Sequence, residues 1–207
     1  MKRFFWRIFG ALLFAAAQLP SVCSAAQFEI TPFAGHTWGG TFSDGMTGNI
    51  AQVDDAGSYG LIVGFQQDAR SQIELYVSHL ATQVLTGTGP FIGKPAFDLD
   101  IEYYHIGGTY TEAEGRVKPY VAGGFGATHM VPKGPGLNNE TRLSLNLGVG
   151  LRIEATERVG FRLEGRWFGT LFNGSGAVFC SNGACALQVE GDLLSQFVTN
   201  AGVYVAF

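Results

Sequence analysis

The chain has 207 residues, which suits one domain preceded by a processed leader. It contains 30 glycines and 17 phenylalanines but only 14% charged residues, and this excludes a disordered chain, which needs low hydrophobicity and high charge. The formal net charge of −4 gives no basic excess, so no nucleic-acid partner is expected.

Residues 1–26 differ in kind from the rest of the chain. Lys2, Arg3 and Arg7 precede an apolar stretch, which Pro20 and then small residues follow. This is the order of a secretory signal peptide. The alternative, a membrane anchor helix, is disfavoured because the apolar run is shorter than about 20 residues. Cleavage removes three positive charges and takes the net charge from −4 to −7, leaving residues 27–207 as the mature domain.

Beyond the leader the cysteines are Cys180 and Cys185. Two cysteines so close together in an exported protein predict a disulfide. The alternative, a metal site, would need further ligands nearby, and no histidine lies close to them in the sequence. No metal and no other cofactor is predicted.

In the mature chain, apolar and polar residues alternate with period two, as in half-buried strands. Eight segments follow this pattern: 28–42, 57–66, 72–83, 97–110, 116–129, 141–154, 159–172 and 193–207. The segments between them are alternately long and short, which is typical of a transmembrane β-barrel with long external loops and short periplasmic turns. The predicted fold class is all-β, an eight-stranded antiparallel up-and-down barrel.

Alternation alone does not decide which face is outside, because a secreted lipocalin-like barrel would point its apolar face inward. The polar face is rich in opposite charges and in glycine, which would make room for long side chains in a narrow lumen. The alternative is that the charges are ordinary solvated surface groups. The predicted polar face carries Glu29, Glu74, Asp100, Glu102, Lys118, Arg152, Glu154, Arg162, Glu164 and Arg166. The same register places His105 toward lipid.

Aromatic residues fall near the strand ends on the apolar face. Two belts are expected where such rings meet lipid headgroups. The belt at the short turns would contain Phe28, Phe65, Phe161 and Phe207, and the belt at the long loops Trp38, Tyr59, Phe125, Trp167 and Phe197.

The chain ends on Asn200-x-Gly202-x-x-Val205-x-Phe207. This pattern resembles the C-terminal sorting signal of bacterial outer-membrane barrels. The resemblance implies that the barrel-assembly machinery recognises the last strand, and that Phe207 faces lipid.

Residues 27–207 as a whole resemble the small outer-membrane β-barrel family, the OmpA/OmpX-like eight-stranded barrels of the porin-family type. The segments FEITPFAGHTWGG, QIELYVSH and RVKPYVAGGFGA have the character of that family. The resemblance implies a monomeric protein of the Gram-negative cell envelope, integral to the outer membrane and surrounded by its lipid.

The charges on the predicted inner face have two interpretations. Eight of them, Glu74, Glu102, Lys118, Arg152, Glu154, Arg162, Glu164 and Arg166, could pair into a network that closes the lumen, or could line a narrow ion pathway. At this strand number we expect a closed lumen, with a structural or surface-interaction role carried by the loops. A small porin, or a route for hydrophobic molecules, is the alternative.

A lipid-modifying hydrolase is the third class of function. It would need a serine beside a histidine on one strand face, hence two residues apart. None of His36, His79, His105 and His129 has such a serine. The sequence therefore predicts no enzymatic activity.

Overall fold

The computed structural model describes the backbone of residues 28–43, 50–87, 94–111, 115–134, 137–172, 176–181, 184–189 and 193–207. Side chains are described over the same ranges except 41–43, 50–51, 86–87, 94–96, 176–181 and 184–189. The predicted signal peptide, residues 1–26, lies outside these ranges. Within them, no helix has the length and apolar character needed to cross a membrane.

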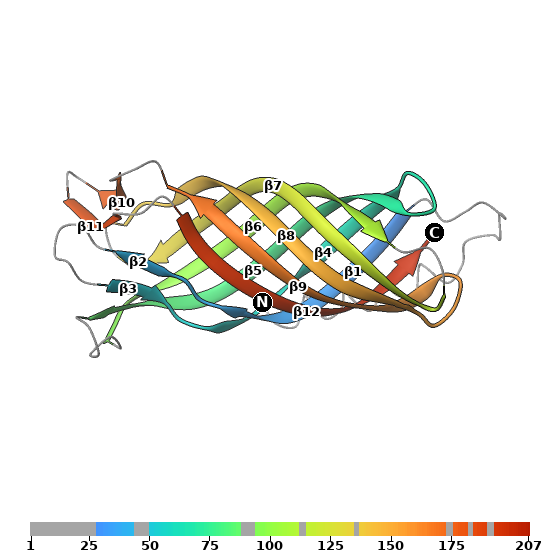
Figure 1. Ribbon diagram of the computed structural model, residues 1–207. Helices are drawn as coiled ribbons and strands as arrows, with labels where there is room; N and C mark the ends of the chain where they lie inside the picture. The colour runs from blue at the N-terminus through green and yellow to red at the C-terminus, as the bar shows by residue number, and fades with distance from the viewer. Residues whose placement is uncertain are drawn as a thin grey trace.

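Eight long strands close into an antiparallel barrel (Figure 1). They are β1 (Phe28–Trp38), β4 (Ala56–Gln66), β5 (Ser71–Gly87), β6 (Lys94–Thr111), β7 (Val117–Lys133), β8 (Glu140–Glu154), β9 (Val159–Leu171) and β12 (Leu193–Ala206). Each pairs with the next along the chain, and β12 pairs with β1 to close the sheet. The predicted fold class is confirmed, and all eight predicted strands are present.

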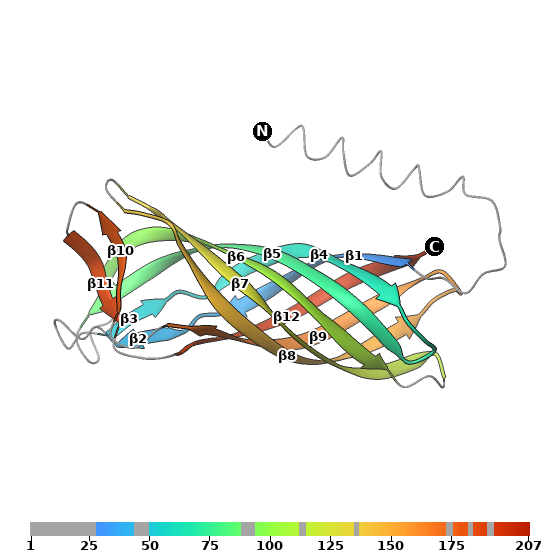
Figure 2. The same cartoon turned by 90° about the horizontal axis from the view of Figure 1, so that it is seen from above.

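Four short strands that the sequence analysis did not predict lie at one end of the barrel (Figures 1 and 2). They are β2 (Thr41–Ser43), β3 (Ile50–Val53), β10 (Gly176–Ser181) and β11 (Ala184–Val189). β3 pairs with the end of β5 beyond β4, and β10 and β11 form a separate hairpin. This end, opposite the C-terminus, carries the long connections and is called the loop end below; the other is the short-turn end.

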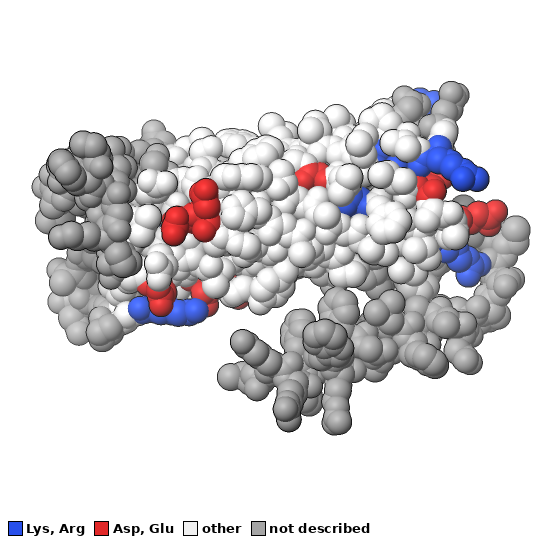
Figure 3. Space-filling view, turned by 90° about the horizontal axis from the view of Figure 1, so that it is seen from below, with Lys and Arg blue, Asp and Glu red and all other residues white. Residues whose placement is uncertain are grey.

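The apolar side of each strand faces outward over most of the wall. On β8, Leu143, Leu147 and Val149 are 61–71% exposed, whereas Ser144 and Asn146 are at most 3% exposed. A lipocalin-like arrangement would give the reverse. Charged residues are sparse over the middle of the face in Figure 3 and gather toward its two ends. The wall therefore offers an apolar band, as a membrane barrel requires.

The predicted aromatic belts lie on this outer wall. At the short-turn end, Phe28, Phe65, Phe161 and Phe207 are 36–52% exposed, and the rings of Phe28 and Phe207 lie 6.4 Å apart. At the loop end, Trp38 lies 5.8 Å from Phe197.

The predicted orientation of the loop-end half of β6 is wrong. The side chains of Leu99, Ile101, Tyr103 and His105 are at most 2% exposed and face the lumen. Glu102 and Asp100, predicted to face inward, alternate with them and lie on the outer wall. The physical reason is that polarity inverts near the loop end: the lumen there is apolar and the outer wall is polar.

Glycines on the inner face accommodate large rings from neighbouring strands. Tyr120 lies opposite Gly150, and Tyr204 lies opposite Gly160. In both pairs, a Cβ on the glycine would overlap the phenol ring. The lumen is therefore filled by aromatic rings that fit only because the adjacent strand carries no side chain at that point.

Candidate functional site: the closed lumen

Four charged side chains cross the lumen near the short-turn end. Arg162, Glu164 and Arg166 point inward from β9, because alternate residues of a strand share a face. Glu74 points inward from β5, which is the fourth strand from β9 in either direction around the barrel. The four residues therefore connect opposite walls.

These four side chains form a closed ring of alternating charge, called the arginine–glutamate ring below. Arg162 pairs with both Glu74 and Glu164, the latter at 2.6 Å. Arg166 also pairs with both, at 3.2 Å from Glu74 and 2.6 Å from Glu164. Each residue is at most 6% exposed, and the two positive and two negative charges balance. Such mutual pairing is what buried charges require.

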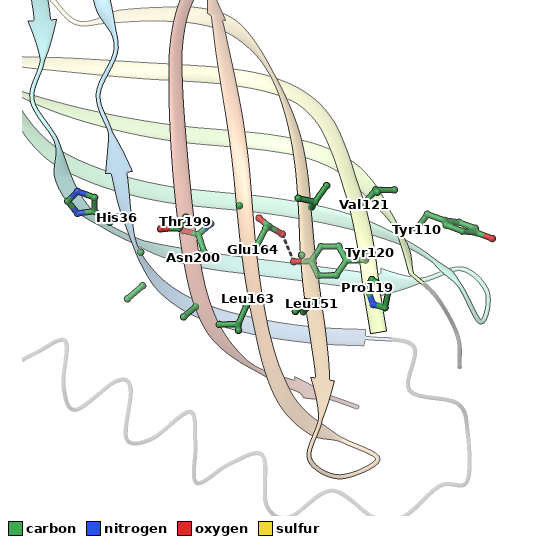
Figure 4. A pocket seen from close by; sticks show the side chains of 16 residues that line it. His36, Tyr110, Pro119, Tyr120, Val121, Leu151, Leu163, Glu164, Thr199 and Asn200 are labelled. Atoms are coloured by element: carbon green, nitrogen blue, oxygen red, sulfur yellow. Dashed lines mark hydrogen bonds between the residues drawn. The ribbon is translucent and has the colours of Figure 1, made fainter. Parts of the chain in front are cut away.

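Two tyrosines complete the ring. The Tyr120 hydroxyl donates to Glu164 at 2.7 Å and accepts from Arg162 Nε at 2.7 Å; Figure 4 draws the first of these bonds as a dashed line. The Arg162 guanidinium lies 4.6 Å from the Tyr120 ring centroid, and Arg166 lies 4.6 Å from that of Tyr76. Cation–π contacts of this kind add to the pairing when both groups are desolvated.

Two further ion pairs lie closer to the short turns. Arg152 pairs with Glu29 at 2.5 Å and lies 4.0 Å from the ring centroid of Tyr204. Lys118 pairs with Glu154 at 2.5 Å, and both side chains are partly exposed. The structure thus brings seven of the eight predicted lumen charges into pairs inside the barrel.

Glu102 is the eighth predicted charge, and it lies apart from the others on the outer wall. Its carboxylate accepts from the Tyr104 hydroxyl at 2.7 Å and lies 3.5 Å from His79 Nδ1. The pattern that could have placed Glu102 on the outer wall is the apolar series Leu99, Ile101 and Tyr103, which alternates with it on β6. These residues extend the apolar lining that β5 gives to the lumen.

An aromatic layer lies above the ring, toward the loop end. The rings of Tyr103 and Phe168 stack at 4.2 Å, and Tyr76 lies 5.4 Å from Phe168. His105 meets Phe168 edge-on at 5.2 Å. The Arg166–Tyr76 contact joins this layer to the arginine–glutamate ring.

Beyond the aromatic layer the lumen becomes aliphatic. The side chains there are at most 2% exposed and include Leu80, Val84, Leu99, Ile101, Met130, Leu194 and Val198. This layer was not predicted, because the alternation of the strands predicts a polar lumen along the whole barrel.

Ser144, His105 and Asn146 form a contact that the sequence search missed. Ser144 Oγ lies 2.8 Å from His105 Nε2, and Asn146 Nδ2 lies 2.7 Å from His105 Nδ1. A serine two residues from His105 would lie on the same strand, whereas Ser144 reaches His105 from β8 across Gly126 of β7.

This trio lacks the arrangement of a hydrolase. A catalytic histidine accepts the serine proton at one nitrogen while its other nitrogen donates to an orienting oxygen. Here Asn146 presents its NH₂ group to Nδ1, so Nε2 carries the proton and donates to Ser144. His105 and Ser144 are also at most 3% exposed.

The remaining predicted residues lie at the end of the chain and in the hairpin. Asn200 faces the lumen, where it donates to the Tyr76 hydroxyl at 3.3 Å, and the Phe207 amide donates to the Phe28 carbonyl at 2.8 Å. Gly202 lies inward and Val205 outward on β12. The backbones of Cys180 and Cys185 are register partners, but their side chains are not described, so the disulfide stays a prediction.

A groove lies on the outer wall across β1, β12, β9, β8 and β7 (Figure 4). Its lining combines outward residues such as Ala34, Gly165 and Ala201 with residues whose side chains face the lumen, among them Tyr120, Glu164 and Asn200.

Comparison with known proteins identifies the fold. No protein-family model matches the sequence, and curated proteins give no significant match. Outer membrane protein OprG from Pseudomonas aeruginosa has a TM-score of 0.62 at 17% identity, over 88% of this chain and 96% of that one. Neisserial surface protein A has a TM-score of 0.57 at 16% identity, over 87% and 97%.

A third solved structure, outer membrane protein AlkL in DMPC lipid bilayers, has a TM-score of 0.51 at 13% identity, over 91% of this chain and 94% of that one. At these identities the likeness shows the fold. The predicted resemblance to small outer-membrane β-barrels is confirmed at the level of the fold.

Proposed function

We propose that the protein is an integral outer-membrane barrel whose lumen is closed to ions and which serves as a rigid scaffold for its loops. The arginine–glutamate ring is the observation that carries this proposal. It joins opposite walls, its charges balance, and all four side chains are buried. An ion pathway would instead need charged groups that water and ions can reach.

The layers above the ring support the same conclusion. Aromatic and aliphatic side chains fill the loop-end half of the lumen, and those of Leu99, Ile101, Met130 and Phe168 are 0% exposed. An ion that crossed the barrel would have to displace both the apolar layers and the ring.

Current across a planar bilayer at neutral pH tests the proposal. Folded wild-type protein, identified by its altered mobility on a detergent gel before boiling, is expected to give no discrete current steps. Removing Arg162 and Glu74 together keeps Arg166 paired with Glu164 and the lumen neutral, and because the apolar layers still close the loop-end half, current is expected only when Leu99 and Met130 are also replaced by alanine. Glu102→Gln on the outer wall is the matched control and should stay silent. Salt-dependent steps from the wild type would refute the closed lumen.

Within this proposal the surrounding partner is outer-membrane lipid, the barrel-assembly machinery inserts the chain through its last strand, and the protein is a monomer without enzymatic activity. A surface ligand would bind the connections at the loop end, because external loops on a rigid barrel carry specificity. The longest of these connections contains Cys180 and Cys185. Mass measurement with and without a reductant tests their disulfide.

A second candidate is passage of small hydrophobic molecules, which the aliphatic layer of the lumen favours. Leu99 and Met130 would then be displaced by the passenger. Met130→Ala should speed entry of a hydrophobic dye into proteoliposomes under this candidate, whereas a scaffold would show no change. Leu147→Ala on the outer wall is the control.

A further inference from the structure

His105 occupies the boundary between the ionic and apolar parts of the lumen. It is 1% exposed, and Phe168 and Tyr103 meet its ring at 5.2 and 5.8 Å. Both ring nitrogens have a partner, Ser144 at Nε2 and Asn146 at Nδ1. A histidine whose two nitrogens are both engaged has a protonation state that its partners determine.

The neighbouring arginine fixes the state of His105. Arg166 Nη1 donates to the Asn146 side-chain oxygen at 3.1 Å. The amide of Asn146 therefore directs its oxygen to Arg166 and its NH₂ group to His105 Nδ1. Because an NH₂ group can only donate, Nδ1 must be an unprotonated acceptor. This arrangement exists only while His105 is neutral.

Adding a proton at Nδ1 would disturb the ring through Asn146. The new N–H would face the NH₂ group of Asn146, so two donors would meet. Turning the amide over relieves that conflict but directs its NH₂ group at Arg166, which again opposes two donors. In either orientation Asn146 lacks an acceptor for one of its neighbours, and a cationic imidazolium stands near Arg166. Arg166 is the residue that pairs with both glutamates of the ring.

We propose that His105 is a proton-sensitive switch of the arginine–glutamate ring: the neutral imidazole keeps Arg166 in place through Asn146, and protonation loosens Arg166 and weakens the ring. The inference rests on the closed lumen of the proposed function. The proton comes from the solvent and binds Nδ1, and no covalent bond changes.

The charged groups around His105 favour loosening of the ring when His105 is protonated. The titratable and charged side chains on the strands packed about it are Tyr103 on β6, Tyr76 and Glu74 on β5, and Arg166 and Glu164 on β9. β8 contributes Ser144 and Asn146, and β7 contributes glycines. Both glutamates are already paired with the two arginines, so neither is available to the imidazolium.

The free energy of unfolding, measured by urea titration in lipid vesicles from about pH 7.5 to about pH 4, tests the switch, because this range brackets the ordinary titration of histidine. The unfolding equilibrium constant of the wild type is expected to rise on acidification, by at most about tenfold per pH unit because one proton binds. His105→Gln, which cannot titrate, should remove the acid response. His129→Gln is the matched control, since His129 is exposed and bonded to Thr141, and it should retain the response.

The outcomes separate the two proposals. Current across a planar bilayer at neutral pH would refute the closed lumen, whereas an unfolding free energy that does not fall in acid, or a fall that persists in His105→Gln, would refute the switch. A ¹⁵N NMR spectrum of the wild type keeps the test independent of folding of the variant. An unprotonated Nδ1 at neutral pH is expected, and a protonated Nδ1 would overturn the proposal.

Discussion

The two halves of the lumen are filled by opposite chemistry. Near the short turns, paired charges cross the barrel, with Arg162 and Arg166 held between Glu74 and Glu164. Near the loop end most inward side chains are aliphatic, with threonines such as Thr82 and Thr170 among them. The outer wall beside them is polar: Asp100 pairs with Lys133 at 2.7 Å and Glu102 lies beside His79. The wall meets lipid only over its apolar band, so beyond that band the usual preference for a polar interior and an apolar exterior no longer applies. The polarity of a strand residue therefore depends on its depth in the membrane as well as on the face of the sheet to which its side chain points.

Removing one charge from the ring should have the largest effect. Glu164→Ala leaves Arg162 and Arg166 buried without their shared carboxylate, at a cost of about 3–5 kcal/mol in the free energy of unfolding. Urea titration in lipid vesicles, followed by the mobility of unboiled samples, measures it. Glu102→Ala is the control in the polar outer wall, where a pair about a third exposed should contribute about 0–1 kcal/mol. Equal costs for the two variants would mean that the ring is not a desolvated network.

The aliphatic layer should also be sensitive to substitution, for a different reason. Leu99→Ala leaves a cavity in a packed region and is expected to cost about 2–5 kcal/mol. Leu147→Ala removes the same atoms from an outward side chain that is 61% exposed and leaves no cavity. The same urea titration compares them. A Leu99 variant as stable as the Leu147 variant would show that the loop-end half of the lumen is loosely filled.

Filling the space beside the Tyr204 phenol should have an intermediate effect on stability. Gly160→Ala forces a Cβ against the Tyr204 phenol and the Ile153 carbonyl, and such overpacking costs about 1–3 kcal/mol. Gly57→Ala is the matched control because the nearest atom to its Cβ would lie 3.9 Å away. The two thermal unfolding midpoints should differ, with the Gly160 variant lower; coincident midpoints would contradict the close fit.

The smallest expected effect lies outside the membrane, in the short turn between β4 and β5. The backbone N–H of Arg70 and then that of Ser71 donate to Asp68 and lower the pKa of its carboxyl below the ordinary value of 3.8. The ionised form therefore stabilises the folded turn above the ordinary pKa, and this contribution is lost as the pH falls through the lowered pKa. The unfolding free energies of wild type and Asp68→Asn should converge in acid; a difference that does not vary with pH would contradict the assignment.

The barrel could be predicted from the sequence because each strand follows a strong local rule. On β8, six successive outward positions from Leu143 to Ile153 are aliphatic, which fixes both strand and face. The ring charges on β9 obey the same rule. The contact of Glu74 with these charges could not be predicted in the same way. It depends on β5 lying opposite β9, and that position follows only from closure of the sheet.

The prediction of the inward face failed on β6, where the alternation of polar and apolar residues arises from an apolar lumen and not from an apolar outer wall. His105, Asp100 and Glu102 follow the alternation of β6 faithfully, but with the two faces exchanged. The contact of His105 with Ser144 could not be read from either strand alone. It depends on Gly126 of the strand between them, whose missing side chain lets residues two strands apart touch.

The arginine–glutamate ring also has a mechanical consequence. Hydrogen bonds between strands hold the wall together around its circumference but do little to stop a thin cylinder from becoming oval under lateral pressure. A cross-link between β5 and β9 fixes the diameter along one direction. Because β5 and β9 lie four strands apart, this cross-link exists only when the two halves of the chain face each other across the closed barrel.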